Sequence, residues 1–330
     1  MAYLKGESIT MGVAVETVRG TGIAPTDFLP SRTASDIKKN VEKTMIKETR
    51  GTGYGTYGTE ITHARGEGEV EFNLKNRTIG YFLKSLLGAV SSAVKGGESV
   101  VYNHTFSILN TSPANPTLTI AISQQGFQHY EYNGVVVNKL EIEAKMDDVV
   151  TVKAGFISRD ESEHADYTPS FNGNDYLFRN HDFKVKLATT LGGLAGATAL
   201  PLKEFKLTLA NNGKANHVVN AITPDDVLGG INEIGGTLKV DYTGKTLYDY
   251  YKNNTSLYME ISTINTAQAI GVSSNPSMIT TLYKVSLTNY KADRPIDDIV
   301  AESIDFNAHY STADSKAVQV VLTNEKTNYN

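Results

Sequence analysis

Several residue types and patterns that usually mark a protein class are missing from this 330-residue chain. It has no cysteine, which excludes disulfide frameworks, thiolate nucleophiles and cysteine-ligated zinc. Its formal net charge is −5, so the composition does not indicate a basic surface that binds nucleic acid. The most apolar stretch, Ile79 to Val94, is interrupted by Lys84 and is too short to span a bilayer. The N-terminal residues lack the apolar core of a signal peptide.

Catalytic and ligand-binding signatures are missing as well. The seven histidines form neither HExxH nor HxH, and the sequence contains no GxSxG. The glycine-rich run Gly51–Gly58 has no buried strand before it and no helical period after it, so it does not match a nucleotide-binding loop. His104 lies in a predicted strand, where a structural role is expected. We therefore predict no catalytic residue, no cofactor, no metal and no enzyme activity.

One phrase of the sequence occurs twice, about half the chain apart. Gly68–Lys84 reads GEVEFNLKNRTIGYFLK, and Gly236–Lys252 reads GTLKVDYTGKTLYDYYK. In both, apolar and polar residues first alternate as in a half-buried strand, and after a polar turn the apolar residues take helical spacing. Thr78 and Thr246 stand where helix N-caps are expected, and Asn253-Asn254 should end the second helix. The sequence therefore predicts one strand–turn–helix unit used twice.

Further strand-like segments follow each copy, and we match them one to one in the order in which they occur. After the first come Tyr102–Asn110, Val136–Ala144 and Val149–Ile157, and after the second come Thr281–Asn289, Val300–Ala308 and Ala317–Thr323. The polar run Arg159–Asp175 has the Pro and Gly content of a connection. We predict a mainly β protein with two tandem domains, 1–175 and 176–330. Each should be a β-sandwich or partly open barrel with one flanking α-helix.

The first half contains segments that resemble a known family in their order and spacing. They are GTGIAPTDFLP (Gly20–Pro30), the block Gly68–Val90, YNHTFSI (Tyr102–Ile108) and the run Val136–Ile157. The second half continues with LPLKEFKLTLANN and then the repeated phrase. This arrangement is similar to that of the major tail tube proteins of bacteriophages with long, non-contractile tails (siphophages). We therefore expect the two predicted domains to be tail-tube-like.

The resemblance implies a structural virion protein. Subunits of that family join their inner sheets edge to edge into a closed β-barrel ring. The rings stack around a tape-measure protein, between the tail terminator and the tail-tip proteins, and later conduct DNA during genome ejection. Because six tube domains per ring are usual, two domains in one chain imply three chains per ring. The protein would assemble in the host cytoplasm and end in the virion tail, without contact to a membrane.

Acidic residues on the predicted strand faces are candidates for the lumen of such a tube. They are Glu69, Glu71, Glu141, Glu143 and Asp305, each opposite an apolar strand face. Paired acids on one strand face are more typical of the wet side of a sheet than of a glycosidase cleft. A chain of net negative charge repels phosphate, so DNA should pass through without specific binding.

The Gly-, Thr- and Tyr-rich segment Glu48–Glu69 fits neither predicted core. It has no sustained apolar period and is expected to form a long hairpin or loop, which in compact domains is usually functional or disordered. Tyrosine gives contact area at low entropic cost. Gly51, Tyr54, Tyr57 and Gly58 are therefore candidates for contact between rings.

Two other functions remain open from the sequence. A surface-binding β-sandwich, such as an adhesin or a carbohydrate-binding module, would need aromatic side chains gathered on one exposed face. The chain has 18 tyrosines but no tryptophan, which weakens that reading. Another phage tail component, such as a tail terminator or a contractile-tail tube, is the second alternative. Hollow tubes of uniform width in microscopy of the purified protein would support the tube function, and a persistent monomer that binds glycans would support the adhesin.

Overall fold

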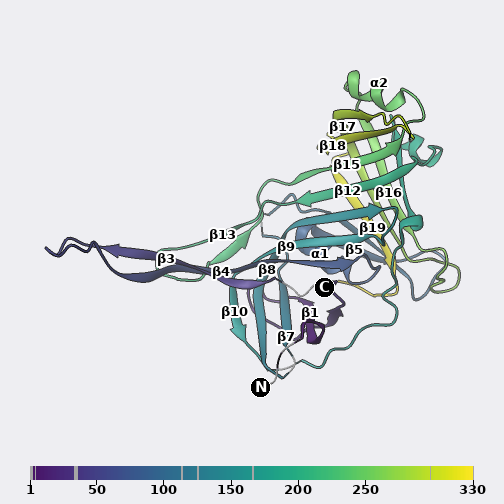
Figure 1. Ribbon diagram of the computed structural model, residues 1–330. Helices are drawn as coiled ribbons and strands as arrows, with labels where there is room; N and C mark the ends of the chain where they lie inside the picture. The colour runs from purple at the N-terminus through teal and green to yellow at the C-terminus, as the bar shows by residue number, and fades with distance from the viewer. Residues whose placement is uncertain are drawn as a thin grey trace.

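The computed structural model describes residues 3, 5–32, 36–112, 114–124, 126–165, 167–297 and 299–329, which are mainly β-strand (Figure 1). The first half contains β1 (Ile9–Val15), β2 (Asp27–Leu29), β3 (Lys38–Lys47), β4 (Thr56–Asn73), α1 (Ile79–Leu87), β5 (Gly88–Val94), β6 (Tyr102–Ile108), β7 (Leu118–Gln124), β8 (Gln128–Lys145), β9 (Thr151–Ser158) and β10 (Asp160–Glu163). The second half contains β11 (Phe183–Ala188), β12 (Leu202–Ala210), β13 (Lys214–Asn216), β14 (Asp226–Leu228), β15 (Glu233–Asp241), α2 (Thr246–Lys252), β16 (Leu257–Ile264), β17 (Ser277–Asp293), β18 (Ala301–Ala308) and β19 (Val318–Asn324). The predicted mainly β class is confirmed.

One sheet crosses both halves of the molecule. Its strands lie in the order β3–β4–β9–β8–β12–β15–β18–β17, and every neighbouring pair is antiparallel. We call it the shared sheet. Two long strands, β8 and β17, run out of it and continue in smaller sheets. The first part of β8 pairs with β7 and β10, and the first part of β17 pairs with β16 and β19.

The pairing scheme of the first half recurs in the second. In the first half β4 pairs with β9, β9 with β8, β8 with β7 and β7 with β1. In the second half β15 pairs with β18, β18 with β17, β17 with β16 and β16 with β11. Both copies of the repeated phrase occupy the same place in this scheme, at the end of β4 or β15 and in the helix that follows. The β5–β6 hairpin has no counterpart, because β16 follows α2 directly.

The strand segments that follow the two helices do not correspond one to one in the order predicted from the sequence. Tyr102–Asn110 was matched with Thr281–Asn289, but β17 takes the position of β8 rather than of β6. Likewise β18 takes the position of β9, and β19 that of β10. The match failed because alternating apolar residues occur in every half-buried strand and do not identify which strand it is. The predicted connection Arg159–Asp175 also begins with a strand, since Asp160–Glu163 pairs with β8.

The two helices differ in burial and in how they begin. All nine residues of α1 are buried, whereas in α2 only Leu247 is. Thr78 occupies the N-cap position of α1, yet its side chain caps nothing and instead donates to Asp175. The Asp175 carboxylate accepts the backbone N–H groups of Arg77 and Thr78, so a residue distant in sequence caps this helix. Thr246, the other predicted N-cap, is the first residue inside α2.

Close packing explains why a glycine stands at the start of each copy of the repeated phrase. A Cβ at Gly68 would meet the backbone around Ile37, with the Ile37 nitrogen at 2.7 Å. A Cβ at Gly236 would meet the backbone oxygen of Lys206 and lie 2.8 Å from the Phe306 ring. The residues just before β3 in the first half, and β12 in the second, therefore approach too closely for a side chain.

Gly236→Ala is expected to destabilise the protein by about 1–3 kcal/mol, because the blocking atoms include backbone that cannot rotate away. The measurement is the free energy of unfolding in denaturant. Gly192→Ala is the matched control in the same half, since a Cβ there meets nothing within 4 Å. Equal stability of the two variants would contradict the packing argument.

The two halves share one hydrophobic core, and three of the contacts that join them involve β8, β6 and the chain end. β8 pairs with β12 in the shared sheet, and β6 of the first half pairs with β19 of the second. The chain end supplies the third contact. Tyr329, only 1% exposed, lies against α1 with its ring 5.4 Å from that of Tyr81, and its hydroxyl donates to the Arg77 carbonyl at 2.7 Å. The end of the second half thus completes the core of the first.

Candidate functional site: polar sheet face and projecting hairpin

The five acidic residues predicted for a lumen lie on one face of the shared sheet. Directly paired residues point to the same side of a sheet, and Lys153 faces both Glu71 and Glu141 across its two neighbouring strands. Glu69 and Glu143 follow at alternate positions of the same strands, and Asp305 reaches this face through β15, where it pairs with Thr237. The opposite face is buried core, including Phe72, Ile142 and Phe306.

Basic and amide side chains pair with all five acids. Lys153 contacts Glu69 at 2.5 Å and Lys145 contacts Glu143 at 2.7 Å. Two lysines hold Glu141, Lys139 at 2.7 Å and Lys206 at 3.1 Å. The remaining partners are Arg32, 3.7 Å from Glu71, and Asn289, which donates to Asp305 at 2.8 Å.

These contacts keep the face charged but locally balanced. Burial opposes ionisation of Glu141, yet hydrogen bonds from Lys139 and Lys206 hold the pKa of its carboxyl below the ordinary value. The hydrogen bond to Glu69 raises the pKa of Lys153, and that to Glu143 raises the pKa of Lys145. Opposite charges a few ångströms apart offset each other, and salt screens what remains of the field of exposed charges beyond roughly 10 Å at 0.1 M. Lysines on the same strands therefore compensate the acids of this face, which the net charge of the chain alone did not predict.

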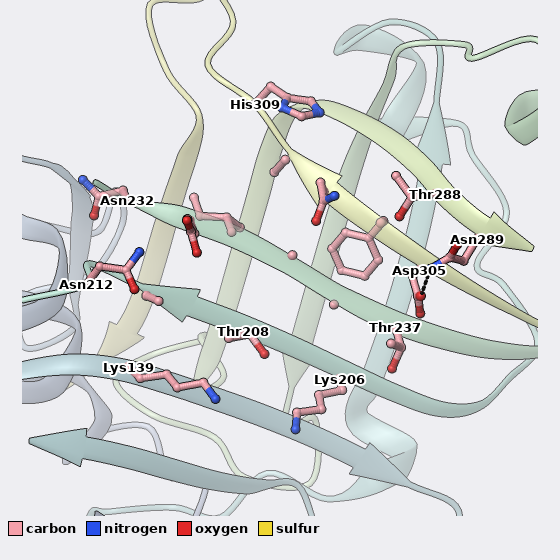
Figure 2. A pocket seen from close by; sticks show the side chains of 18 of the residues that line it. Lys139, Lys206, Thr208, Asn212, Asn232, Thr237, Thr288, Asn289, Asp305 and His309 are labelled. Atoms are coloured by element: carbon pink, nitrogen blue, oxygen red, sulfur yellow. Dashed lines mark hydrogen bonds between the residues drawn. The ribbon is translucent and has the colours of Figure 1, made fainter. Parts of the chain in front are cut away.

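The second-half part of this face is hollowed. The hollow measures about 1030 Å³ and lies over β8, β12, β15, β18 and β17, with polar side chains pointing into it (Figure 2). The labelled side chains are Lys139, Lys206, Thr208, Asn212, Asn232, Thr237, Thr288, Asn289, Asp305 and His309. The hollow is therefore lined by hydroxyl and amide groups and by charged groups that have partners, so its surface is hydrophilic.

The hairpin of β3 and β4 projects far from the body of the molecule (Figure 1). Its ladder runs from Lys38 paired with Glu67 to Lys47 paired with Thr56. We call the part from Glu42 to His63 the arm. Apolar side chains on the arm are exposed, including Met45 at 60% and Ile61 at 48%. A two-stranded ribbon with little core of its own is only marginally stable until something covers it.

The tip of the arm contains the other predicted site. Gly51, with φ of 68°, and Tyr54 lie in the turn, whereas Tyr57 and Gly58 belong to the start of β4. The Tyr57 hydroxyl donates to the Tyr54 carbonyl at 3.0 Å, and the Arg50 guanidinium lies 4.3 Å over the Tyr57 ring. The Tyr54 side chain is 80% exposed. The predicted hairpin is confirmed, and its tip exposes Tyr54 above a half-buried Tyr57.

Comparison with known proteins identifies the family. A family model described as phage tail tube protein matches residues 6–308, nearly the whole chain. The chain belongs to the phage tail tube protein family. Its role is therefore structural, as a tail tube component that assembles with copies of itself. No curated protein matches the sequence significantly.

The base of the arm in this tail tube protein is held by the second half. The ring of His63 lies 4.6 Å from that of His217, and its Nε2 lies 2.8 Å from Glu42. The backbone N–H of Ala64 donates to the carbonyl of Ile222 at 2.8 Å. The connection between β12 and β15, which carries the small β13–β14 sheet, thus buttresses the arm of the tail tube protein where it leaves the body.

His104 has the structural role expected from its strand. It is fully buried, its Nδ1 lies 2.7 Å from the Ser92 hydroxyl and its Nε2 lies 3.0 Å from the Asn324 side-chain oxygen. Burial lowers the pKa of this imidazole. In the tail tube protein it fastens the β5–β6 hairpin to β19.

Among the residues that the structure describes, no helix combines the length and the apolar character needed to span a bilayer.

The sequence reasoning missed two sets of residues in the tail tube protein. Lys139 and Lys145 stand two residues from Glu141 and Glu143 in the same strand, so period-two spacing already placed them on the acidic face. Tyr329 and Asp175, which cover and cap α1, gave no local signal because their partners are distant in sequence.

Proposed function

We propose that this chain carries two tandem tube domains, 1–175 and 176–330, and that three chains close into one ring with six similar positions. Stacked rings would form the tube of a long, non-contractile phage tail, around a tape-measure protein and between terminator and tip proteins. The tube would assemble in the host cytoplasm and later conduct DNA during ejection. No catalytic step is assigned to it.

The observation that carries this proposal is the junction between the halves. There β8, the last strand of the first set, pairs with β12, the first strand of the second set, over seven residue pairs from Glu204–Lys145 to Ala210–Lys139. In the described chain the outer edges of β3 and of 286–293 in β17 carry no further ladder. An unpaired edge is a template for another chain, and ring closure removes it. Pairing β17 of one copy with β3 of the next would repeat the internal junction.

The polar face of the shared sheet fits the lumen of such a ring. Its hollow in Figure 2 is on the side opposite the apolar core, where a closing barrel would have its water-filled interior. A wall of alternating, paired charges neither holds phosphate nor strongly repels it, so DNA slides along it. Glu69, Glu71, Glu141, Glu143 and Asp305 are the acids proposed to line it.

Electron cryo-microscopy of the purified, polymerised protein tests the proposal. We expect hollow tubes whose rings contain three chains with pseudo-six-fold symmetry and whose inner wall carries Glu141 and Lys206. Rings of six chains would refute the stoichiometry, and an outer position of Glu141 would refute the lumen assignment. A protein that stays monomeric under all conditions would count against the tube function itself.

A further inference from the structure

An exposed group of tyrosines lies over α2, next to the free edge of β17. The rings of Tyr248 and Tyr251 lie 5.0 and 5.9 Å from that of Tyr290, which itself stands on the edge segment 286–293. Tyr248 is 42% exposed and Tyr251 is 37% exposed, and neighbouring Tyr242 is 44% exposed. We call these four side chains the tyrosine patch. Clustered aromatic side chains beside an unpaired strand edge are typical of an interface.

The first half shows what covers the corresponding helix. In the repeated phrase Gly80 corresponds to Tyr248, and at Gly80 the ring of Tyr329 rests so closely that a Cβ would lie 2.6 Å from its hydroxyl oxygen. Lys84 donates to the Tyr329 carbonyl at 2.5 Å, and Lys326 contacts Asp27 at 3.1 Å. The segment that follows β19 therefore seals α1.

The counterpart of that segment does not reach α2 in the same chain. β10 holds the place of β19, since each pairs with the first part of its long strand, so the residues after β10 correspond to the chain end. Within them, Tyr167 donates to Glu131 at 2.8 Å. Phe171 touches Phe28 edge-on at 6.3 Å and stays 52% exposed. These contacts all lie within the first half.

The order of the strands indicates which segment of a neighbouring copy would cover the tyrosine patch. Within one chain, the first half contributes β8 to the junction, and the second half contributes β12. The end of the second half covers α1, the helix of the first. At a junction between copies, β17 would meet β3 of the next first half. The segment that follows β10 in that half includes Tyr167–Phe171. We infer that the tyrosine patch of one copy is covered by Tyr167–Phe171 of a second copy of this chain.

The sizes of the groups fit this exchange. In the first half a small residue on the helix, Gly80, receives a large ring from the chain end. In the second half large rings stand on the helix, and the incoming segment offers the small residues Thr168, Pro169 and Ser170 before Phe171. The contact is mostly apolar with hydroxyl groups at its rim, as in the centre of a protein interface. It rests on the ring arrangement proposed above.

The absence of native cysteine allows a direct test. A Tyr251→Cys, Phe171→Cys double variant is assembled into tubes and treated with a short bis-maleimide. Cross-linked dimers and trimers are expected on a denaturing gel, whereas each single variant gives only monomers. Phe171→Cys with Tyr310→Cys is the control, because Tyr310 is 51% exposed, more than Tyr251 at 37%, but follows the end of β18 that lies away from Tyr290 and α2. Cross-linking of the control pair at the same yield would overturn the inference.

A second measurement needs no variant. Wild-type subunits and wild-type tubes are nitrated with tetranitromethane, and modification of each tyrosine is read by mass spectrometry. Assembly is expected to protect Tyr248 and Tyr251 severalfold. Tubes in which both remain as reactive as in free subunits would overturn the inference and leave the tube function intact. A protein that forms no tubes would instead remove the proposed function on which the inference rests.

Discussion

Deletion of Gly51–Gly58 is expected to give folded, soluble subunits that no longer polymerise. The deleted residues lie at the tip of the arm, away from the core, so the free energy of unfolding should change little. Central aromatic residues in interfaces often contribute about 2 kcal/mol or more each. Loss of one such contact corresponds to roughly a 30-fold higher critical concentration for assembly.

Sedimentation of polymer and thermal unfolding of subunits separate the two effects of the deletion. The point variant Tyr54→Ala should raise the critical concentration without changing the melting temperature, because Tyr54 is 80% exposed in the subunit. Tyr3→Ala is its control, with a side chain that is 85% exposed. Normal tubes from the deletion variant would remove the arm from the contact between rings.

Tyr329→Ala is expected to have the largest effect on the stability of the subunit. The ring lies against Tyr81, His104 and Phe106, and its truncation opens a cavity beside α1. Removing a buried aromatic side chain usually costs about 3–5 kcal/mol. For a cooperative unit of 330 residues this lowers the melting temperature by roughly 4–7 °C. Calorimetry or circular dichroism at fixed protein concentration provides the measurement.

Tyr329→Phe separates ring packing from hydrogen bonding. It keeps the ring but removes the hydroxyl that donates to Arg77 and accepts from Asn324, so we expect a loss of about 1–3 kcal/mol. Tyr310→Ala is the exposed control and should change stability by less than about 0.5 kcal/mol. If Tyr329→Ala behaves like Tyr310→Ala, the chain end does not complete the core of the first half.

Local pattern predicted the elements well and their partners poorly. The alternation in Val136–Ala144 places Leu140 and Ile142 in the core and Glu141 and Glu143 on the wet face, and the structure agrees. The same alternation could not distinguish the partner of that strand, so the correspondence of later segments was assigned incorrectly. Likewise Thr78 satisfied the local rule for an N-cap, whereas Asp175 from the far end of the first half binds the free N–H groups.

Because side-chain period depends only on neighbours in the chain, the strands and helices, the repeated unit and the faces that carry the candidate lumen acids could all be predicted from the sequence alone. The partners and the burial of those faces depend on tertiary contacts. The tertiary structure paired Glu141 with Lys206 from the other half, joined β8 to β12, and buried α1 under Tyr329 while leaving α2 with an exposed tyrosine patch. Such contacts join residues far apart in the chain, and no local period records which of them meet.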